Sequence, residues 1–191
     1  MAVGTLEAGR GQPVTVIAPG GTFPAEQVQH HGDDLRGTRI CFDWQASGWF
    51  EQVAGLRREA DRDAGEVLAV SRAHSASRAI GLSRGARAVI GALADAPDLF
   101  ERVVLVLPPG GHAAGKYASW LRELATTDGP MVTATFLVIA HRGDPGHPVR
   151  VAEAWAKLLA GRLEVLPSRE LSSRPERIRE LAAEFLNDGG R

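Results

Sequence analysis

The 191-residue sequence contains a single cysteine, Cys41, so no disulfide can form within the chain and the cysteine pairs of a structural zinc site are missing. It lacks a run of 18 apolar residues and an apolar core of signal-peptide type near its start, so we expect neither a membrane span nor a secretory leader. The net charge is only −1 and no dense Lys/Arg block occurs, which argues against nucleic-acid or membrane-surface binding. We therefore expect a cytoplasmic protein.

The sequence has instead the pattern of an α/β protein, with short apolar runs alternating with amphipathic stretches. It predicts a doubly wound, mainly parallel sheet of about six strands with helices on both faces. We expect one domain over 13–191, preceded by a flexible leader over 1–12. Helical spacing appears within 50–68 and 151–159, and again in the segment that opens at Pro175. The predicted strands are 14–18, 38–42, 79–82, 103–107, 135–140 and 163–166.

The segment Ala79-Ile80-Gly81-Leu82-Ser83-Arg84-Gly85-Ala86 reads as a strand that ends in Gly-x-Ser-x-Gly and passes into a helix. This is the pattern of a nucleophile elbow, in which glycines on both sides of the serine let the crossing backbones approach. Ser83 is the predicted nucleophile. The alternative is a glycine-rich turn that merely contains a serine.

A second loop, Pro19-Gly20-Gly21-Thr22, follows the first predicted strand. In a doubly wound sheet the first and third predicted strands flank the point where strand order reverses, and ligands bind there. A tetrahedral oxyanion needs two N–H donors, and we expect one from Arg84 and one from Gly21 or Thr22. Read more plainly, Pro-Gly-Gly is a common turn.

Asp144 lies just past the end of the predicted strand over 135–140, where a carboxylate could orient an imidazole. It could also cap the next helix or stabilise the Asp144-Pro145-Gly146 turn. Both readings place a carboxylate at the carboxyl end of the sheet.

Together these motifs resemble the α/β-hydrolase superfamily over residues 13–187, and the chain looks like a small, lidless member. The resemblance implies that family's fold and site, with a minimal cap around 110–134. Members typically carry an Asp, a helix, a last strand and then the catalytic His shortly before the final helix. No His occurs in 168–175, where Arg174 falls near the expected place. The motifs that carry the resemblance are 18–22, 39–43, 79–86, 100–105 and 143–148.

The base of a serine relay must then come from elsewhere, and His112 is our first choice because it follows the strand next to the elbow. The alternative is an exposed loop histidine. His141 and His147 bracket Asp144. We interpret His147 as a loop residue before the helix that Pro148 starts and His141 as packed at the strand end, with a chemical role for either one as the alternative. His30 and His31 could line the pocket.

Four further residues are predicted to bind substrate: Gly20 in the oxyanion loop, Trp44 and Trp120 as apolar walls, and Arg174 as a partner for Asp144 or for an anionic ligand group. Each has an ordinary alternative, since tryptophans are more often core and Arg174 could simply face solvent.

Three functions remain open. The first is a serine hydrolase acting on an acyl ester or lactone carbonyl of a small molecule, with Ser83, Asp144 and His112 as a non-standard triad. The second is a repurposed enzyme that catalyses a cyclisation, elimination or epimerisation, and the third is a catalytically silent binding module. No metal or cofactor is implied, and self-association into a homo-oligomer is left open.

Overall fold

The computed structural model describes residues 4–21, 23–44, 56–110, 132–174 and 176–188. Its centre is a seven-stranded sheet in the order β1-β3-β2-β4-β5-β6-β7, parallel except for β1, which runs antiparallel to β3. The expectation of a mainly parallel sheet is confirmed. The strands are β1 Thr5–Gly9, β2 Val14–Ala18, β3 Thr38–Phe42, β4 Arg78–Leu82, β5 Arg102–Val106, β6 Thr135–His141 and β7 Arg162–Leu166.

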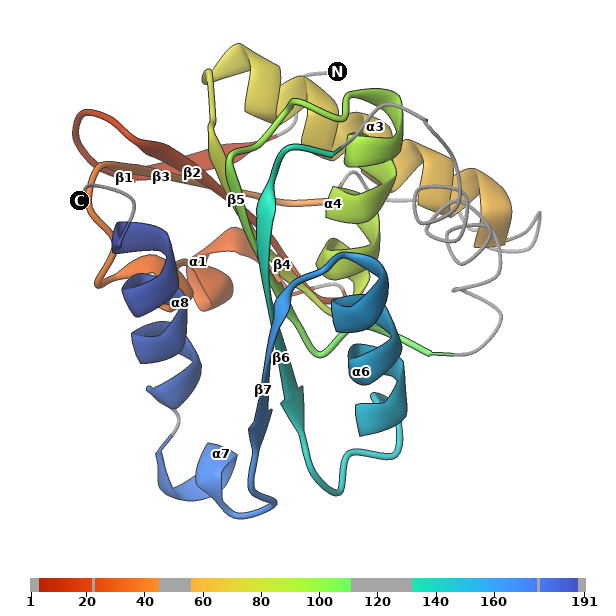
Figure 1. Ribbon diagram of the computed structural model, residues 1–191. Helices are drawn as coiled ribbons and strands as arrows, with labels where there is room; N and C mark the ends of the chain where they lie inside the picture. Colours follow the sequence, from red (N-terminus) through yellow and green to blue (C-terminus); the bar gives the residue numbers. More distant parts are fainter. Residues whose placement is uncertain (1–3, 22, 45–55, 111–131, 175, 189–191) are drawn as a thin grey trace.

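Helices cover both faces of this sheet, with α3, α4 and α6 on one side and α1 and α8 on the other (Figure 1). The central strands are mostly apolar because each face packs against helices, and β2 and β4 are buried along their whole length. Two apolar cores result, one on each side of the sheet. The helices are α1 Ala25–Val28, η1 Gln29–Gly32, α3 Leu56–Ala73, α4 Arg84–Asp95, α6 Val149–Leu158, α7 Glu170–Ser173 and α8 Arg177–Asn187.

The prediction of a flexible leader over residues 1–12 is wrong for 5–9, which form the edge strand β1. This strand is mostly exposed, and Leu6 is its one large apolar residue, packed against the core on the α8 side. A single apolar anchor is too weak a pattern to predict a strand, so pairing with β3 decides the conformation. The final helix begins at Arg177. Pro175, where we expected it to open, lies outside the described residues.

The topology brings the two predicted loops together. β2 pairs with β3 on one side and with β4 on the other, so the strand order reverses at β2 and the carboxyl ends of β2 and β4 are neighbours. The loop after β2 and the turn after β4 therefore meet at the same edge of the sheet.

Candidate active site

Ser83 occupies the sharp turn between β4 and α4, in a backbone conformation that side-chain-bearing residues rarely adopt. Its φ is 50° and its ψ is −106°. Such strain persists only where the surrounding structure enforces it. Here the Ser83 amide donates a hydrogen bond to the Val106 carbonyl (2.8 Å), and α4 begins at the next residue. The turn thus fixes the serine at the carboxyl end of β4.

The glycines on either side of Ser83 are required by close backbone contacts. A Cβ on Gly81 would lie 2.6 Å from the Ala86 Cα, and one on Gly85 would lie 2.1 Å from the Ala18 carbonyl oxygen. Both separations are shorter than van der Waals contact, and the clashing atoms are backbone that cannot swing away. The Gly-x-Ser-x-Gly spacing therefore has the packing role that the sequence predicts for an elbow.

The Ser83 hydroxyl lies beside an imidazole, and that imidazole lies beside a carboxylate. Ser83 Oγ is 2.8 Å from His147 Nε2, and His147 Nδ1 is 2.8 Å from Asp144 Oδ2. The side chains of His147 and Asp144 are 23% and 25% exposed, so the relay is partly shielded yet open to a small molecule. When Nδ1 carries its proton toward Asp144, Nε2 is free to accept the Ser83 hydroxyl proton.

Asp144 is held by its own loop. Its Oδ1 accepts hydrogen bonds from the backbone amides of Gly146 (2.8 Å) and His147 (3.1 Å), which leaves Oδ2 for the imidazole. Burial raises the pKa of the Asp144 carboxyl, but the hydrogen bonds from the His147 side chain and the Gly146 amide outweigh it, and the net shift is downward. Asp144 is therefore ionised at neutral pH.

The sequence favoured His112 as the base, because it follows the strand next to the elbow, and His147 was interpreted as a loop residue. The structure joins Ser83 and Asp144 through this histidine, while His112 lies outside the described residues. A signal was present in Asp144-Pro145-Gly146-His147. An Asp that accepts from the amide two residues on closes an Asx turn, which brings the third residue back toward the carboxylate.

The loop after β2 lies directly against the elbow. A Cβ built on Gly20 would lie 3.1 Å from the Leu82 carbonyl oxygen and 3.5 Å from the Ser83 Cβ, so this loop approaches the serine closely. Gly21 has φ +54°, a left-handed conformation. Phe23 is 58% exposed beside it. Thr22 lies outside the described residues, as do Trp120 and most of the predicted cap.

The other predicted residues take the following places. The Trp44 indole N–H donates to the Pro19 carbonyl (3.1 Å), and its ring lies under the Arg84 guanidinium. Arg174 forms ion pairs with Glu176 and Glu180 rather than with Asp144. The Arg84 amide belongs to the first residue of α4, directly after the nucleophile.

The remaining histidines have structural neighbours. His141 Nε2 lies 3.0 Å from the Ser168 carbonyl oxygen, which links the end of β6 to the segment after β7. The rings of His30 and His31 lie against each other in η1, with centroids 4.2 Å apart and planes tilted by 36°. Burial, followed by the neighbouring His30, lowers the pKa of His31 to about 4.

Within the described ranges, no three His, Cys, Asp or Glu side chains are grouped so that they could hold a metal ion. The same part of the chain contains no helix with the length and apolar character needed to cross a membrane.

No family model matches the sequence, and no curated protein matches it either. Solved structures do match. A candidate non-heme bromoperoxidase of Mycobacterium tuberculosis is 17% identical with TM-score 0.72, over 98% of this chain and 96% of that one. A serine hydrolase of carbazole degradation is 17% identical with TM-score 0.68, over 97% and 94%. An enzyme that degrades N-acyl homoserine lactones is 12% identical with TM-score 0.66, over 96% of this chain and 97% of that one. The chain therefore has the α/β-hydrolase fold that its sequence motifs resemble.

Proposed function

We propose that this protein is a serine hydrolase of small-molecule esters or lactones, with Ser83 as nucleophile, His147 as general base and Asp144 as the carboxylate that orients it. The observation that carries the proposal is the unbroken chain of two 2.8 Å contacts from Ser83 Oγ through the imidazole to Asp144 Oδ2. These distances lie in the range that proton transfer requires. A catalytically silent module would have no need for this relay, whereas a repurposed enzyme could use His147 as a general base, so turnover of an ester distinguishes the proposed hydrolase from it.

In the proposed reaction, Ser83 Oγ attacks the acyl carbon while His147 Nε2 takes the hydroxyl proton. The tetrahedral oxyanion is bound by the Arg84 amide and by an amide of the loop after β2, with Gly21 as the described candidate. When the intermediate collapses, His147 returns the proton to the leaving alkoxide. Water then attacks the acyl-enzyme with His147 again as base, which releases the acid and restores Ser83.

Asp144 supports this reaction because it remains a carboxylate and fixes the tautomer of the imidazole. Its lowered pKa keeps the charge in place at neutral pH, and the two backbone amides on Oδ1 aim Oδ2 at Nδ1. The charge also stabilises the imidazolium that forms in each half-reaction.

The substrate class follows from the surroundings of the serine. The exposed ring of Phe23 lies next to Gly21, so an apolar surface borders the proposed oxyanion loop. An acyl group with an apolar portion would cover this ring. The structures with a similar fold include a lactone-degrading enzyme and a serine hydrolase. Their chemistry supports the proposal that this chain cleaves an ester or a lactone.

The test is turnover of p-nitrophenyl butyrate together with labelling by a fluorophosphonate, which reacts only with an activated serine. We expect wild type to be labelled and to turn over the ester. Ser83→Ala and His147→Ala should each lower kcat by about 10⁴-fold or more. His112→Ala is the matched control and should stay within a few-fold of wild type. If His147→Ala keeps wild-type turnover, or if wild type is neither labelled nor active, the proposal is wrong.

A further inference from the structure

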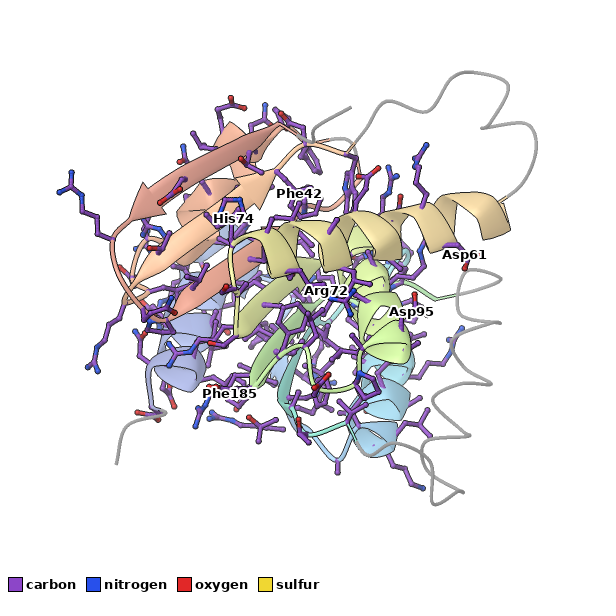
Figure 2. The ribbon with its side chains drawn as sticks, turned by 90° about the horizontal axis from the view of Figure 1, so that it is seen from above. Phe42, Asp61, Arg72, His74, Asp95 and Phe185 are labelled. Atoms are coloured by element: carbon purple, nitrogen blue, oxygen red, sulfur yellow. The ribbon has the colours of Figure 1, made fainter. Side chains whose placement is uncertain are left out.

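A buried carboxylate lies behind the elbow and holds the residue that follows the nucleophile. Asp63 on α3 is completely buried, and α3 packs against α4 (Figure 2, where Asp61 marks the same stretch of α3). The Arg84 guanidinium donates to both Asp63 oxygens, through Nε to Oδ2 (2.7 Å) and through one terminal nitrogen to Oδ1 (2.6 Å). A bidentate pair of this kind fixes the orientation of the arginine as well as its position.

The same guanidinium connects the elbow to the loop after β2. It lies 4.8 Å from the centroid of the Trp44 ring, in the geometry of a cation–π contact. The indole N–H of Trp44 donates to the Pro19 carbonyl (3.1 Å), immediately before Gly20. The Trp44 ring is itself held edge-on by Phe42 at 4.9 Å. A continuous series of contacts thus runs from α3 through Arg84 and Trp44 to the second loop.

We propose that Asp63, the Arg84 side chain and Trp44 form a positioning network that sets the separation of the two oxyanion-binding loops. This inference rests on the proposed hydrolase function, because it concerns the amides of Arg84 and of the Gly20–Gly21 loop. None of the three side chains touches the reacting atoms; they act through the backbone that they hold. An oxyanion hole works only when its donors already stand at the right distance, so the network affects the transition state more than substrate binding.

A purely structural role would give a different result. If Asp63 only joined α3 to α4, its loss would lower stability without a selective effect on kcat in the molecules that stay folded. Glu66 provides the control, since it is also an almost buried carboxylate on α3; it forms an ion pair with Arg62, whose guanidinium also lies 3.8 Å from Asp63 Oδ1. Glu66→Gln removes the same charge from the same helix.

The experiment compares Asp63→Asn and Trp44→Phe with wild type and Glu66→Gln. Asp63→Asn keeps the side-chain volume but replaces one acceptor oxygen by a donor that faces the guanidinium. Trp44→Phe keeps an aromatic ring but removes the N–H that bonds Pro19. For each protein we would measure the unfolding midpoint, kcat and KM on p-nitrophenyl butyrate, and inhibition by an aryl trifluoromethyl ketone, whose adduct with serine carries an oxyanion.

We expect Asp63→Asn and Trp44→Phe to lower kcat by about tenfold or more, with KM within about threefold of wild type. Inhibition by the ketone should weaken by a factor similar to the loss in kcat. Glu66→Gln should keep both values within about threefold. If Asp63→Asn does not fold, Trp44→Phe decides the question alone.

Two results overturn the inference. In the first, Ser83→Ala loses activity as proposed, but Asp63→Asn or Trp44→Phe folds and keeps the kcat of wild type. The hydrolase function is then supported, but the network does not position the oxyanion loops. If the two variants lose no more than Glu66→Gln, the conclusion is the same. Lack of phosphonate labelling and of turnover in wild type would instead remove the proposed function, and the inference with it.

Discussion

Replacing Asp144 with asparagine tests how the imidazole of His147 is held. The side chain keeps its size, but one oxygen becomes an NH₂ group. In the folded protein Asp144 Oδ1 accepts from two backbone amides, those of Gly146 and His147, while Oδ2 faces Nδ1 of the ring. The asparagine can adopt two orientations, in which its NH₂ group faces either the backbone amides or Nδ1 of the ring.

The two orientations differ in energy. If the NH₂ faced the backbone amides, two hydrogen bonds would be lost at about 1 kcal/mol each, so this orientation lies roughly 2 kcal/mol higher. The favoured orientation keeps both amide bonds and points the NH₂ at His147 Nδ1. That nitrogen must then be an acceptor, so the ring proton moves to Nε2. Nε2 would donate to Ser83 instead of accepting its proton, and the general base is lost.

We expect Asp144→Asn to lower kcat on p-nitrophenyl butyrate by about 10⁴-fold, with KM nearly unchanged. The unfolding midpoint should change little, since the volume and both loop hydrogen bonds are retained. The measurement is steady-state kinetics at enzyme concentrations high enough to detect the residual rate, alongside thermal unfolding. A variant that folds normally and keeps more than a tenth of the wild-type kcat would refute the tautomer argument.

Two further predictions concern the scaffold. Gly85→Ala places a methyl group 2.1 Å from the Ala18 carbonyl oxygen, so we expect the free energy of unfolding to fall by more than about 2 kcal/mol and phosphonate labelling to be lost. Urea unfolding and in-gel fluorescence measure the two effects. Values of both close to those of wild type would contradict the close approach of the two backbones. Burial, followed by the neighbouring His30, lowers the pKa of His31 in the folded protein from 6.5 to about 4. The unfolded chain therefore binds a proton more readily, and wild type should lose up to about 3 kcal/mol of stability as the pH falls from 6.5 to about 4. His31→Phe should reduce the pH dependence of the free energy of unfolding, measured by denaturant titrations between pH 7 and pH 4. If the variant keeps the pH dependence of wild type, His31 is not its source.

The sequence predicts the turn around Ser83, because the backbone conformation of this turn depends on residues that are close together in the chain. Gly81, Ser83 and Gly85 are only a few residues apart, and their spacing is dictated by a turn whose contacts any elbow must make. The runs over residues 103–106 of β5 and 136–140 of β6 are likewise continuous and apolar, which is typical of strands buried on both faces. Such features are visible in a single sequence because the constraint and the residues that meet it lie together.

The parts that the sequence did not predict depend on contacts between distant segments. Asp63 and Arg84 are 21 positions apart, and nothing in the helical periodicity of α3 marks Asp63 as a buried ligand of the elbow. The edge strand β1 forms because β3 offers it a partner. The contact between Ser83 and His147 spans 64 positions, and it requires the register of β4, β5 and β6 to bring two loops to one edge.

The family resemblance also led the sequence-based prediction away from His147. The superfamily resemblance places the base after the last strand, so a histidine only three residues beyond Asp144 reads as a loop residue. In this chain the carboxylate and the imidazole come from one short loop between β6 and α6. The contacts that form the relay involve no described residue of the segment after β7, where Arg174 forms an ion pair with Glu180 of the final helix.

This arrangement changes what sets the geometry of the relay. When the carboxylate and the base lie on separate loops, their distance depends on how two segments pack. Here the Asx turn at Asp144 fixes the distance to His147 within the loop itself, and only the contact with Ser83 depends on the tertiary fold. A shift of α6 would therefore move the carboxylate and the imidazole together. It would change the distance from Nε2 to Ser83 Oγ while leaving the tautomer intact, so packing variants around α6 should alter kcat without abolishing the orientation of the base.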